Sequence, residues 1–325
     1  MSHISTKEHL ARFQSLAALL LMVVALSLAT DNFLTVDNGL NVLRQISINL
    51  CLSIGMTLVI LSGGIDLSVG SVLAFSGAVA AGLLKDGIPL PFTDFVLQFT
   101  PLGAIVGGIA VGATLGWVNG FMITRFRLPP FVATLGMLSV ARGFTRLSTG
   151  GFPITDLGPE FTFLGNGYWL GIPMPVWISA ALVAVFVLIT RRTRFGRYVY
   201  AVGGNERAAK LSGLNVSQVK RRVYLLGGAL AGVAGIVATA RQNAADPKIG
   251  DGYELESIAA VVIGGTSLSG GRGSVLGTVL GCLIIGVLKN GLVLLGVSPD
   301  WQLVVKGAVI LVAVAIDQFG RKEDR

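Results

Sequence analysis

Long runs of apolar residues dominate this sequence, and they restrict its fold more than any other feature. Several runs reach roughly 17 residues, about the length that an α-helix needs to cross the hydrocarbon core of a bilayer. The chain is 53% hydrophobic and only 13% charged, with a mean hydropathy of +0.75. A water-soluble domain needs more polar surface than this. The sequence therefore predicts an all-α polytopic membrane protein.

We expect about ten transmembrane helices. The eighth segment is too short to cross alone, which predicts a glycine-broken or re-entrant helix whose backbone is covered by protein or a water-filled cavity. The first apolar run is long for a signal peptide and more spans follow it, so we interpret it as an uncleaved span. The expected limits are 13–30, 46–62, 67–84, 100–122, 129–147, 174–190, 223–240, 256–265, 274–296 and 301–317.

The segment 191–222 is the one long polar stretch between apolar runs. Glu206 is its only acid, and nine of its residues are basic. Because basic loops resist translocation, we expect this loop in the cytoplasm. Seventeen basic residues fall in the expected cytoplasmic segments and four in the expected outer loops, which predicts that both termini are cytoplasmic. The net charge of +8 therefore reflects membrane topology and does not indicate a nucleic-acid partner.

Residues 203–213 have the sequence of a short capped helix. Asn205 can accept hydrogen bonds from the first free amides. Glu206 suits the positive end of the helix and Lys210 its negative end, while Gly213 can end it. Two interpretations remain open, a solvated loop or a helix that docks a cytoplasmic partner. The candidate docking residues are Gly203, Gly204, Asn205, Glu206, Arg207, Ala208, Ala209, Lys210, Leu211, Ser212 and Gly213.

Two glycine-rich breaks, 62–71 and 264–276, interrupt apolar runs and share the pattern G-G-x-x-L-S-x-G. Asp66 in the first break can cap a helix that begins near Leu67. It can also face a polar pathway, because carboxylates at membrane depth are costly and usually functional. Paired breaks are typical of transport pathways, although both are expected near the same membrane face, which does not fit an inverted repeat. The candidate pathway residues are Gly64, Asp66, Ser68, Thr266 and Ser267.

Two further patterns concern packing. Gly108, Gly112, Gly116 and Gly120 follow a four-residue step, which predicts a close contact with a neighbouring helix. Residues 148–173 contain many turn-forming residues and no basic residue. We expect an outer loop there, either a simple connection or a surface for an external partner.

The residue types needed for several kinds of chemistry are missing. The only histidines are His3 and His9, so neither a metal site nor a Ser-His-Asp triad is expected within the membrane. Cys51 and Cys282 both lie inside apolar runs and do not indicate a disulfide framework. The chain has no phosphate-binding G-x-x-x-x-G-K-[ST] loop. We therefore expect no enzyme and no cofactor in this chain, and any ATP must be bound by another chain.

Four stretches resemble the ribose-type monosaccharide permeases of bacterial ABC importers. They are GMTLVILSGGIDLSVGS at 55–71, RTRFGRYVYAVGGN at 192–205, AAVVIGGTSLSGGRG at 259–273 and KNGLVLLGVS at 289–298. The match runs in order from about residue 30 to the end of the chain. It is specific to the permease family and much less so to one sugar.

The resemblance implies a single permease domain over residues 1–325, in the bacterial inner membrane, that pairs with a second copy or a homologous permease. It also implies a cytoplasmic ATPase that binds ATP and Mg, and a periplasmic sugar-binding protein that delivers the ligand. The segment 203–213 would then be the coupling helix that contacts the ATPase. The resemblance does not assign the pathway residue by residue.

One alternative is a proton- or sodium-coupled secondary transporter of a small polar solute. Such a transporter needs titratable groups along its pathway, and Asp66 alone gives this interpretation little support.

Overall fold

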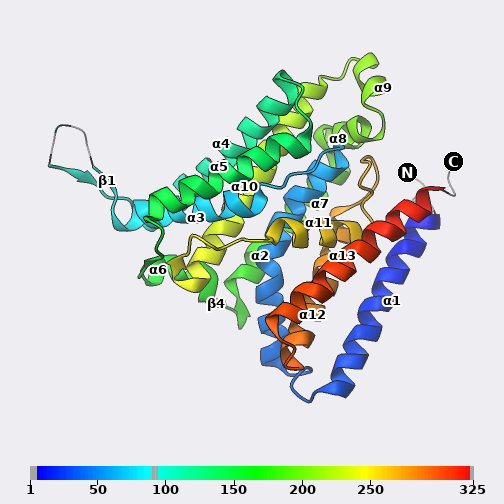
Figure 1. Ribbon diagram of the computed structural model, residues 1–325, viewed down its shortest axis with the longest axis horizontal. Helices are drawn as coiled ribbons and strands as arrows, with labels where there is room; N and C mark the ends of the chain where they lie inside the picture. The colour runs from blue at the N-terminus through cyan, green and yellow to red at the C-terminus, as the bar shows by residue number, and fades with distance from the viewer. Residues whose placement is uncertain (1–5, 90–91, 93, 323–325) are drawn as a thin grey trace.

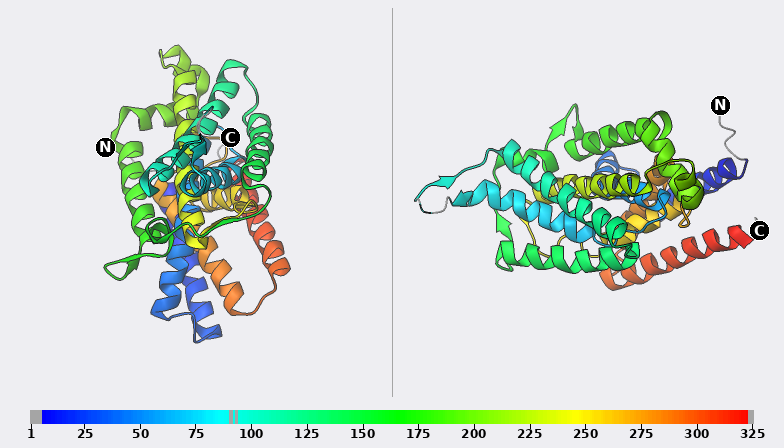
Figure 2. Two further views of the ribbon diagram at one scale, coloured as in Figure 1. Left: turned by 90° about the vertical axis from the view of Figure 1, so that its left-hand side faces the viewer. Right: turned by 90° about the horizontal axis from the view of Figure 1, so that it is seen from above.

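The computed structural model describes residues 6–89, 92 and 94–322, and within them it is mainly helical (Figures 1 and 2). The helices are α1 (Thr6–Ala29), α2 (Val36–Leu61), α3 (Val69–Lys85), α4 (Pro101–Arg125), α5 (Pro130–Thr149), α6 (Pro159–Asn166), α7 (Met174–Arg192), α8 (Arg194–Gly204), α9 (Glu206–Leu211), α10 (Val216–Gln242), α11 (Tyr253–Ile263), α12 (Val275–Leu294) and α13 (Pro299–Lys322). Three antiparallel pairs join the short strands β1 (Ile88–Pro89) and β2 (Val96–Leu97), β3 (Ile154–Thr155) and β6 (Ala244–Ala245), and β4 (Tyr168–Trp169) and β5 (Ile172–Pro173).

Each expected transmembrane segment coincides with one helix, in the order α1 to α5, α7 and α10 to α13. Five of these helices, α2, α4, α7, α10 and α12, are long and apolar enough to cross a membrane by themselves. The prediction of an all-α polytopic protein is confirmed, while the number of ten crossings stays a prediction.

Helices α2 and α10 begin well before the expected spans, as α1 does. α2 begins at Val36 rather than near residue 46, and α10 begins at Val216 rather than near 223. In both cases a polar side chain caps the first turn, since Thr35 accepts a hydrogen bond from the Asn38 amide and Asn215 accepts one from the Gln218 amide. Hydropathy locates the apolar part of a helix and misses such polar extensions.

The glycine face of α4 packs against α10, as the four-residue step predicts. A Cβ atom at Gly112 would lie 2.5 Å from the Gly228 carbonyl oxygen, and one at Gly120 would lie 2.8 Å from the Arg221 Cα. Only glycine permits this approach of two backbones. Helices α2 and α10 occupy the centre of the bundle and are mostly buried.

The short eighth segment is a half-length helix. α11 has only 11 residues, and the non-helical chain 246–252 leads into it from α10 and β6. The Ser257 hydroxyl lies 3.2 Å from that of Ser53, so α11 packs beside the C-terminal half of α2. The expected broken or re-entrant segment is therefore present.

The two ends of the molecule differ in what they carry. Helix α9, the start of α1 and the end of α13 lie toward one end, whereas the β1–β2 hairpin projects from the other (Figure 2). The expected outer loop 148–173 contains α6, whose Phe161 is fully buried, and β3, which pairs with β6. This segment is therefore a packed cover on the end of α10 rather than an irregular loop.

Candidate functional site

The basic segment 191–222, for which the sequence predicts a short capped helix at 203–213, is folded into helices over most of its length. It comprises the end of α7, all of α8 and α9, and the first turns of α10. The Thr193 hydroxyl accepts a hydrogen bond from the Gly196 amide at 3.1 Å and caps α8. The capping residues Thr193, Asn205 and Asn215 thus divide the stretch into separate helices. In α8, Phe195, Val199 and Val202 recur at helical spacing and pack into the core.

Helix α9 has the cap that the sequence predicts. The Asn205 Oδ1 accepts a hydrogen bond from the Ala208 amide at 2.9 Å, and Gly213 follows the helix with a φ of +84°. Glu206 does not pair within its own helix: its carboxylate lies 2.7 Å from the Lys220 Nζ, because the first turns of α10 run beside α9. Most of α9 is exposed, including 89% of Leu211. An exposed, capped helix with an apolar tip can serve as a docking element.

The end of α8 contacts both glycine breaks. The Gly271 amide donates a hydrogen bond to the Leu61 carbonyl at 3.0 Å, which joins the second break to the end of α2. Gly203 packs at this junction, where an added Cβ would lie 2.7 Å from the Gly271 nitrogen. One turn earlier, the Tyr200 hydroxyl donates to the Gly273 carbonyl at 2.9 Å. The structure thus brings Gly203 and Gly204 beside the regions that contain the candidate pathway residues.

The two breaks end their helices in the same way. Gly63 and Gly265 have φ values of +80° and +83°, and each donates its amide to a carbonyl three residues earlier, at 2.9 and 2.8 Å. The next residues, Gly64 and Thr266, both donate to a carbonyl five residues earlier. Gly63 therefore corresponds to Gly265, one position away from the pairing that the shared sequence pattern suggests.

Asp66 is almost fully buried, with 2% of its surface exposed. Its Oδ1 accepts hydrogen bonds from the Ser68 amide at 2.8 Å and the Ser68 hydroxyl at 2.6 Å, and the Asn119 amide group donates to that hydroxyl. Helix α3 begins at Val69 with Ser68 at its N-cap position, so the expectation of a helix starting near Leu67 is wrong. Asp66 stabilises the turn before the helix instead of capping the helix itself.

The other candidate pathway residues lie in the same two breaks. Only 1% of the Thr266 surface is exposed. The Ser267 amide donates a hydrogen bond to the Arg272 carbonyl at 2.9 Å. Within the described part of the chain, three cavities have lining residues assigned, and none of the five candidates is among them. Their role in a pathway stays a prediction.

A polar cavity of about 200 Å³ lies between α2, α10, α11 and α12. Its lining residues are Gln45, Ile48, Asn49, Arg241, Tyr253, Glu256 and Lys289. The Glu256 side chain is only 7% exposed, pairs with Lys306 and lies 3.8 Å from the Lys289 Nζ. These ion pairs join α11 to α12 and α13.

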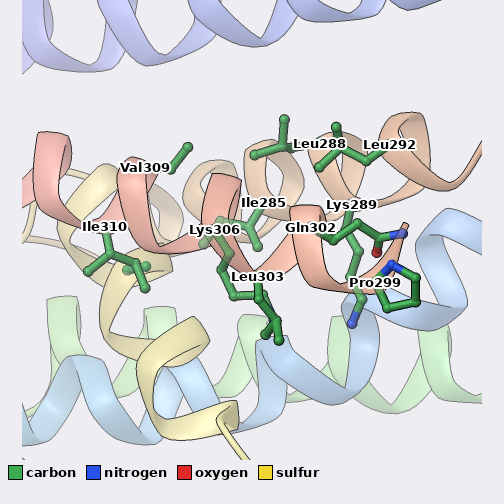
Figure 3. A pocket seen from close by; sticks show the side chains of 11 residues that line it. Ile285, Leu288, Lys289, Leu292, Pro299, Gln302, Leu303, Lys306, Val309 and Ile310 are labelled. Carbon is green, nitrogen blue, oxygen red and sulfur yellow. The ribbon is translucent and has the colours of Figure 1, made fainter. Parts of the chain in front are cut away.

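An apolar cavity of about 270 Å³ lies beside this cluster, between α12 and α13 (Figure 3). Its wall consists mainly of leucine, isoleucine and valine side chains, with Lys289, Gln302 and Lys306 as the polar exceptions. It offers few hydrogen bonds to a hydroxylated solute. Sequence reasoning missed Glu256, although Lys289 and Lys306 within apolar runs were a signal that a buried acid should pair with them.

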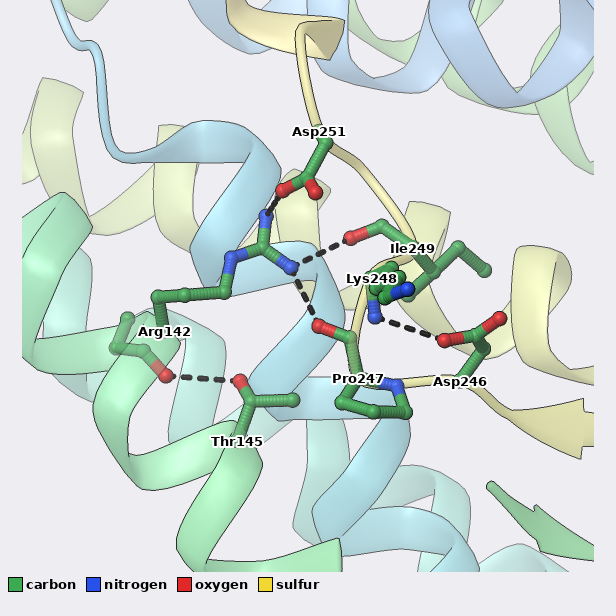
Figure 4. Close-up of polar contacts among 8 residues, drawn as sticks. Arg142, Thr145, Asp246, Pro247, Lys248, Ile249 and Asp251 are labelled. Carbon is green, nitrogen blue, oxygen red and sulfur yellow. Dashed lines mark hydrogen bonds and ion pairs between the residues drawn. The ribbon is translucent and has the colours of Figure 1, made fainter. Parts of the chain in front are cut away.

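Arg142 is a second charged residue that sequence reasoning did not assign (Figure 4). From α5, its guanidinium donates to the carbonyls of Pro247 at 2.8 Å and Ile249 at 2.9 Å, and its other terminal nitrogen lies 2.5 Å from Asp251. One side chain thereby holds the segment that leads into α11. A basic residue well inside the fifth expected span was again the available signal.

Residues 38–314 match a family model described as "Branched-chain amino acid transport system / permease component". The ribose import permease protein RbsC of Escherichia coli (strain K12) is 46% identical over 316 residues, which cover 96% of this chain and 95% of the relative. RbsC of Bacillus subtilis (strain 168) is 49% identical over 303 residues, covering 92% and 90% of the two chains. The D-allose transport system permease protein AlsC of E. coli K12 is 39% identical over 303 residues, covering 93% and 90%. No solved structure matches the chain. The resemblance to ribose-type importer permeases is confirmed. Members of this family are multi-pass membrane components that are not enzymes and need no cofactor in their own chain. The chain belongs to this family of transport-system permeases.

Proposed function

We propose that this chain is the membrane-spanning subunit of an ATP-driven importer that carries a monosaccharide, a ribose-like pentose or a related sugar, across the bacterial inner membrane. The names of the relatives support a sugar, because they specify ribose, D-allose, L-arabinose and xylose. The family model is named after branched-chain amino acids, but the chain is up to 49% identical to ribose permeases. None of these names supports an ion-coupled transporter. The permease domain occupies residues 1–325.

The contact of α8 with both breaks is the observation that carries the mechanism. A cytoplasmic ATPase would push on α9 when it closes around ATP and Mg. Helix α8 would transmit that push to the Leu61 carbonyl at the end of α2 and to Gly271 in the loop before α12. Because packed elements switch between discrete arrangements, a small displacement there can change the access of a central pathway.

The five candidate pathway residues fit the inner end of such a pathway. Gly64, Asp66 and Ser68 follow α2, while Thr266 and Ser267 follow α11, and Gly270 packs against Gly63. In this proposal the two breaks form the constriction that α8 moves. The sugar itself needs few tight contacts there, since its capture belongs to the external binding protein.

The arrangement of the chain ends supports the proposed orientation. The start of α1 and the end of α13 lie at the α9 end of the molecule (Figure 2). In this proposal that end faces the cytoplasm and the ATPase. The β1–β2 hairpin and α6 then face the periplasmic sugar-binding protein. A second copy of this chain or a homologous permease completes the membrane unit, within the lipid bilayer and without nucleic acid.

Reconstitution in liposomes tests this function. The chain with its ATPase and sugar-binding protein should import D-ribose only when ATP and Mg are supplied. The purified chain alone should show neither ATP hydrolysis nor sugar uptake driven by a proton or sodium gradient. Gradient-driven uptake by the chain alone would contradict the importer function.

A further inference from the structure

The segment 246–251 lies at about the middle depth of the helix bundle. Tyr253 and Glu256 of α11 share a cavity with Asn49 of α2. Ile249 packs in one buried cluster with Leu52 and Met56, which lie on either side of the middle of the apolar part of α2, 46–62. Asp251 precedes α11 by two residues and therefore lies at a similar depth.

The environment of this segment is incompatible with lipid on its open side. Its backbone is not helical, and non-helical backbone at membrane depth occurs only where protein or a water-filled cavity covers it. The Asp251 side chain is 65% exposed, even though it pairs with Arg142. A carboxylate that faces hydrocarbon near the bilayer centre is energetically costly.

The segment is held firmly from its other side. Ile249 is only 6% exposed and packs in the core with residues of α2 and α3. The Arg142 guanidinium binds the carbonyls of Pro247 and Ile249 together with the Asp251 carboxylate (Figure 4). Arg142 is 14% exposed, so this anchor lies behind the carboxylate and leaves part of it open.

The charges around this anchor balance. Besides Arg142, the basic members are Arg146 and Lys248, and the acidic members are Asp246, Asp251 and Glu254. Three bases and three acids give no net charge that would select an ion. They offer both donors and acceptors, which suits an uncharged solute with many hydroxyl groups.

We propose that the segment 246–251, positioned by Arg142, forms one wall of a water-filled passage halfway through the membrane, and that the Asp251 carboxylate accepts hydrogen bonds from the hydroxyl groups of the passing sugar. This inference rests on the proposed function as a sugar importer. It names the part of this chain that contacts the solute.

Cysteine labelling in the assembled complex tests the passage wall. Cys51 and Cys282 are each only 1% exposed, so the unaltered chain gives a low background. Asp251→Cys removes the ion pair, whereas Lys248→Cys, at an exposed position in the same segment, leaves it intact. Both should react with the charged reagent 2-sulfonatoethyl methanethiosulfonate. The control Leu21→Cys, at a 71% exposed position on α1, is expected to face lipid.

We expect both wall positions to react at least about tenfold faster than the α1 control, because only a water-exposed thiol forms the reactive thiolate. Rates at 248 and 251 that do not exceed the control rate would overturn the inference. Labelling needs no sugar, so it reports on the wall even if the transported solute were different.

Transport by Asp251→Asn and Asp251→Ala tests the sugar contact. The readout is D-ribose imported per ATP hydrolysed, which a simple loss of folded complex would not change. Alanine should lower this ratio several-fold and asparagine, which keeps an acceptor oxygen, should lower it less. Unchanged ratios in both variants would overturn the contact. Absence of ATP-driven sugar uptake by the unaltered complex would contradict the proposed function itself.

Discussion

The two glycine breaks have the same helix-ending geometry but are held in different ways. In the first break, side chains of three other helices reach the chain: Asn119 of α4 binds Ser68, the Thr134 hydroxyl of α5 accepts from the Leu67 amide at 3.1 Å, and Tyr224 of α10 donates to the Ile65 carbonyl. In the second break, the Gly271 amide donates to the Leu61 carbonyl at the end of α2, and the Tyr200 hydroxyl of α8 donates to the Gly273 carbonyl.

This difference suggests different roles in a moving protein. A break tied to α4, α5 and α10 at once cannot shift without breaking several buried hydrogen bonds, each of which is costly to leave unmade. The second break, whose Gly273 carbonyl accepts a hydrogen bond from Tyr200 of α8, can follow α8. We therefore expect the first break to be the fixed point and the second to be the part that α8 displaces.

The largest effect on transport is expected from Gly203→Val, because Gly203 lies where α8 packs against the end of α2 and the second break. A Cβ there would lie 2.7 Å from the Gly271 nitrogen and also too close to the Leu61 carbonyl oxygen, so the backbones must separate. Overpacking of this kind costs about 1–3 kcal/mol. ATP-driven sugar uptake should be lost while the ATPase still binds. Gly204→Ala is the matched control, because a Cβ at Gly204 meets open space. Equal uptake by the two variants would refute the junction as the route of coupling.

The next effect concerns Asp66 at the first break. Asp66→Ala leaves the buried Ser68 amide and hydroxyl without their acceptor, which should lower the free energy of unfolding by about 1–3 kcal/mol. Asp66→Asn keeps an acceptor oxygen and should be milder. Thermal unfolding and D-ribose uptake per folded, ATPase-bound complex measure the two aspects. A stable asparagine variant with no uptake would instead assign the Asp66 charge to the transport pathway.

A smaller effect on stability is expected at α9. Glu206→Lys places a positive charge at a helix N-terminus and opposite Lys220, which is unfavourable by about 0.3–1 kcal/mol. Its main consequence should be weaker association with the ATPase, measured by co-purification. Asp31→Lys, at an exposed position outside both the docking region and the proposed passage wall, controls for a change in net charge. Normal co-purification and uptake by Glu206→Lys would argue against α9 as the docking helix.

The sequence predicted the features that depend on local pattern. Apolar length located the helices, the four-residue glycine step located the α4–α10 contact, and Asn205 located the α9 cap. It could not predict which distant groups meet. The Glu206–Lys220 pair, the Arg142–Asp251 anchor and the Glu256–Lys306 pair join residues on different elements, and no periodicity encodes them. The same limit explains why the shared sequence pattern pairs Gly63 with Gly264 instead of Gly265. The way a helix ends depends on which glycine adopts a positive φ, and the neighbouring residue types do not determine this.

The smallest effect should come from Thr266→Val at the second break. The Thr266 hydroxyl is buried, and among the described residues it has no hydrogen-bond partner, whereas its backbone amide bonds to the Val261 carbonyl at 3.1 Å. Valine keeps the shape of the side chain and removes a polar group that gains nothing from burial. Thermal stability should change by less than about 1 kcal/mol, and sugar uptake should be retained. The matched change at the first break, Ser68→Ala, removes a hydroxyl that bonds to both Asp66 and Asn119 and should cost more. If Thr266→Val were the more damaging of the two, the second break would depend on its side chains as the first does, and the contrast between a fixed and a moving break would fail.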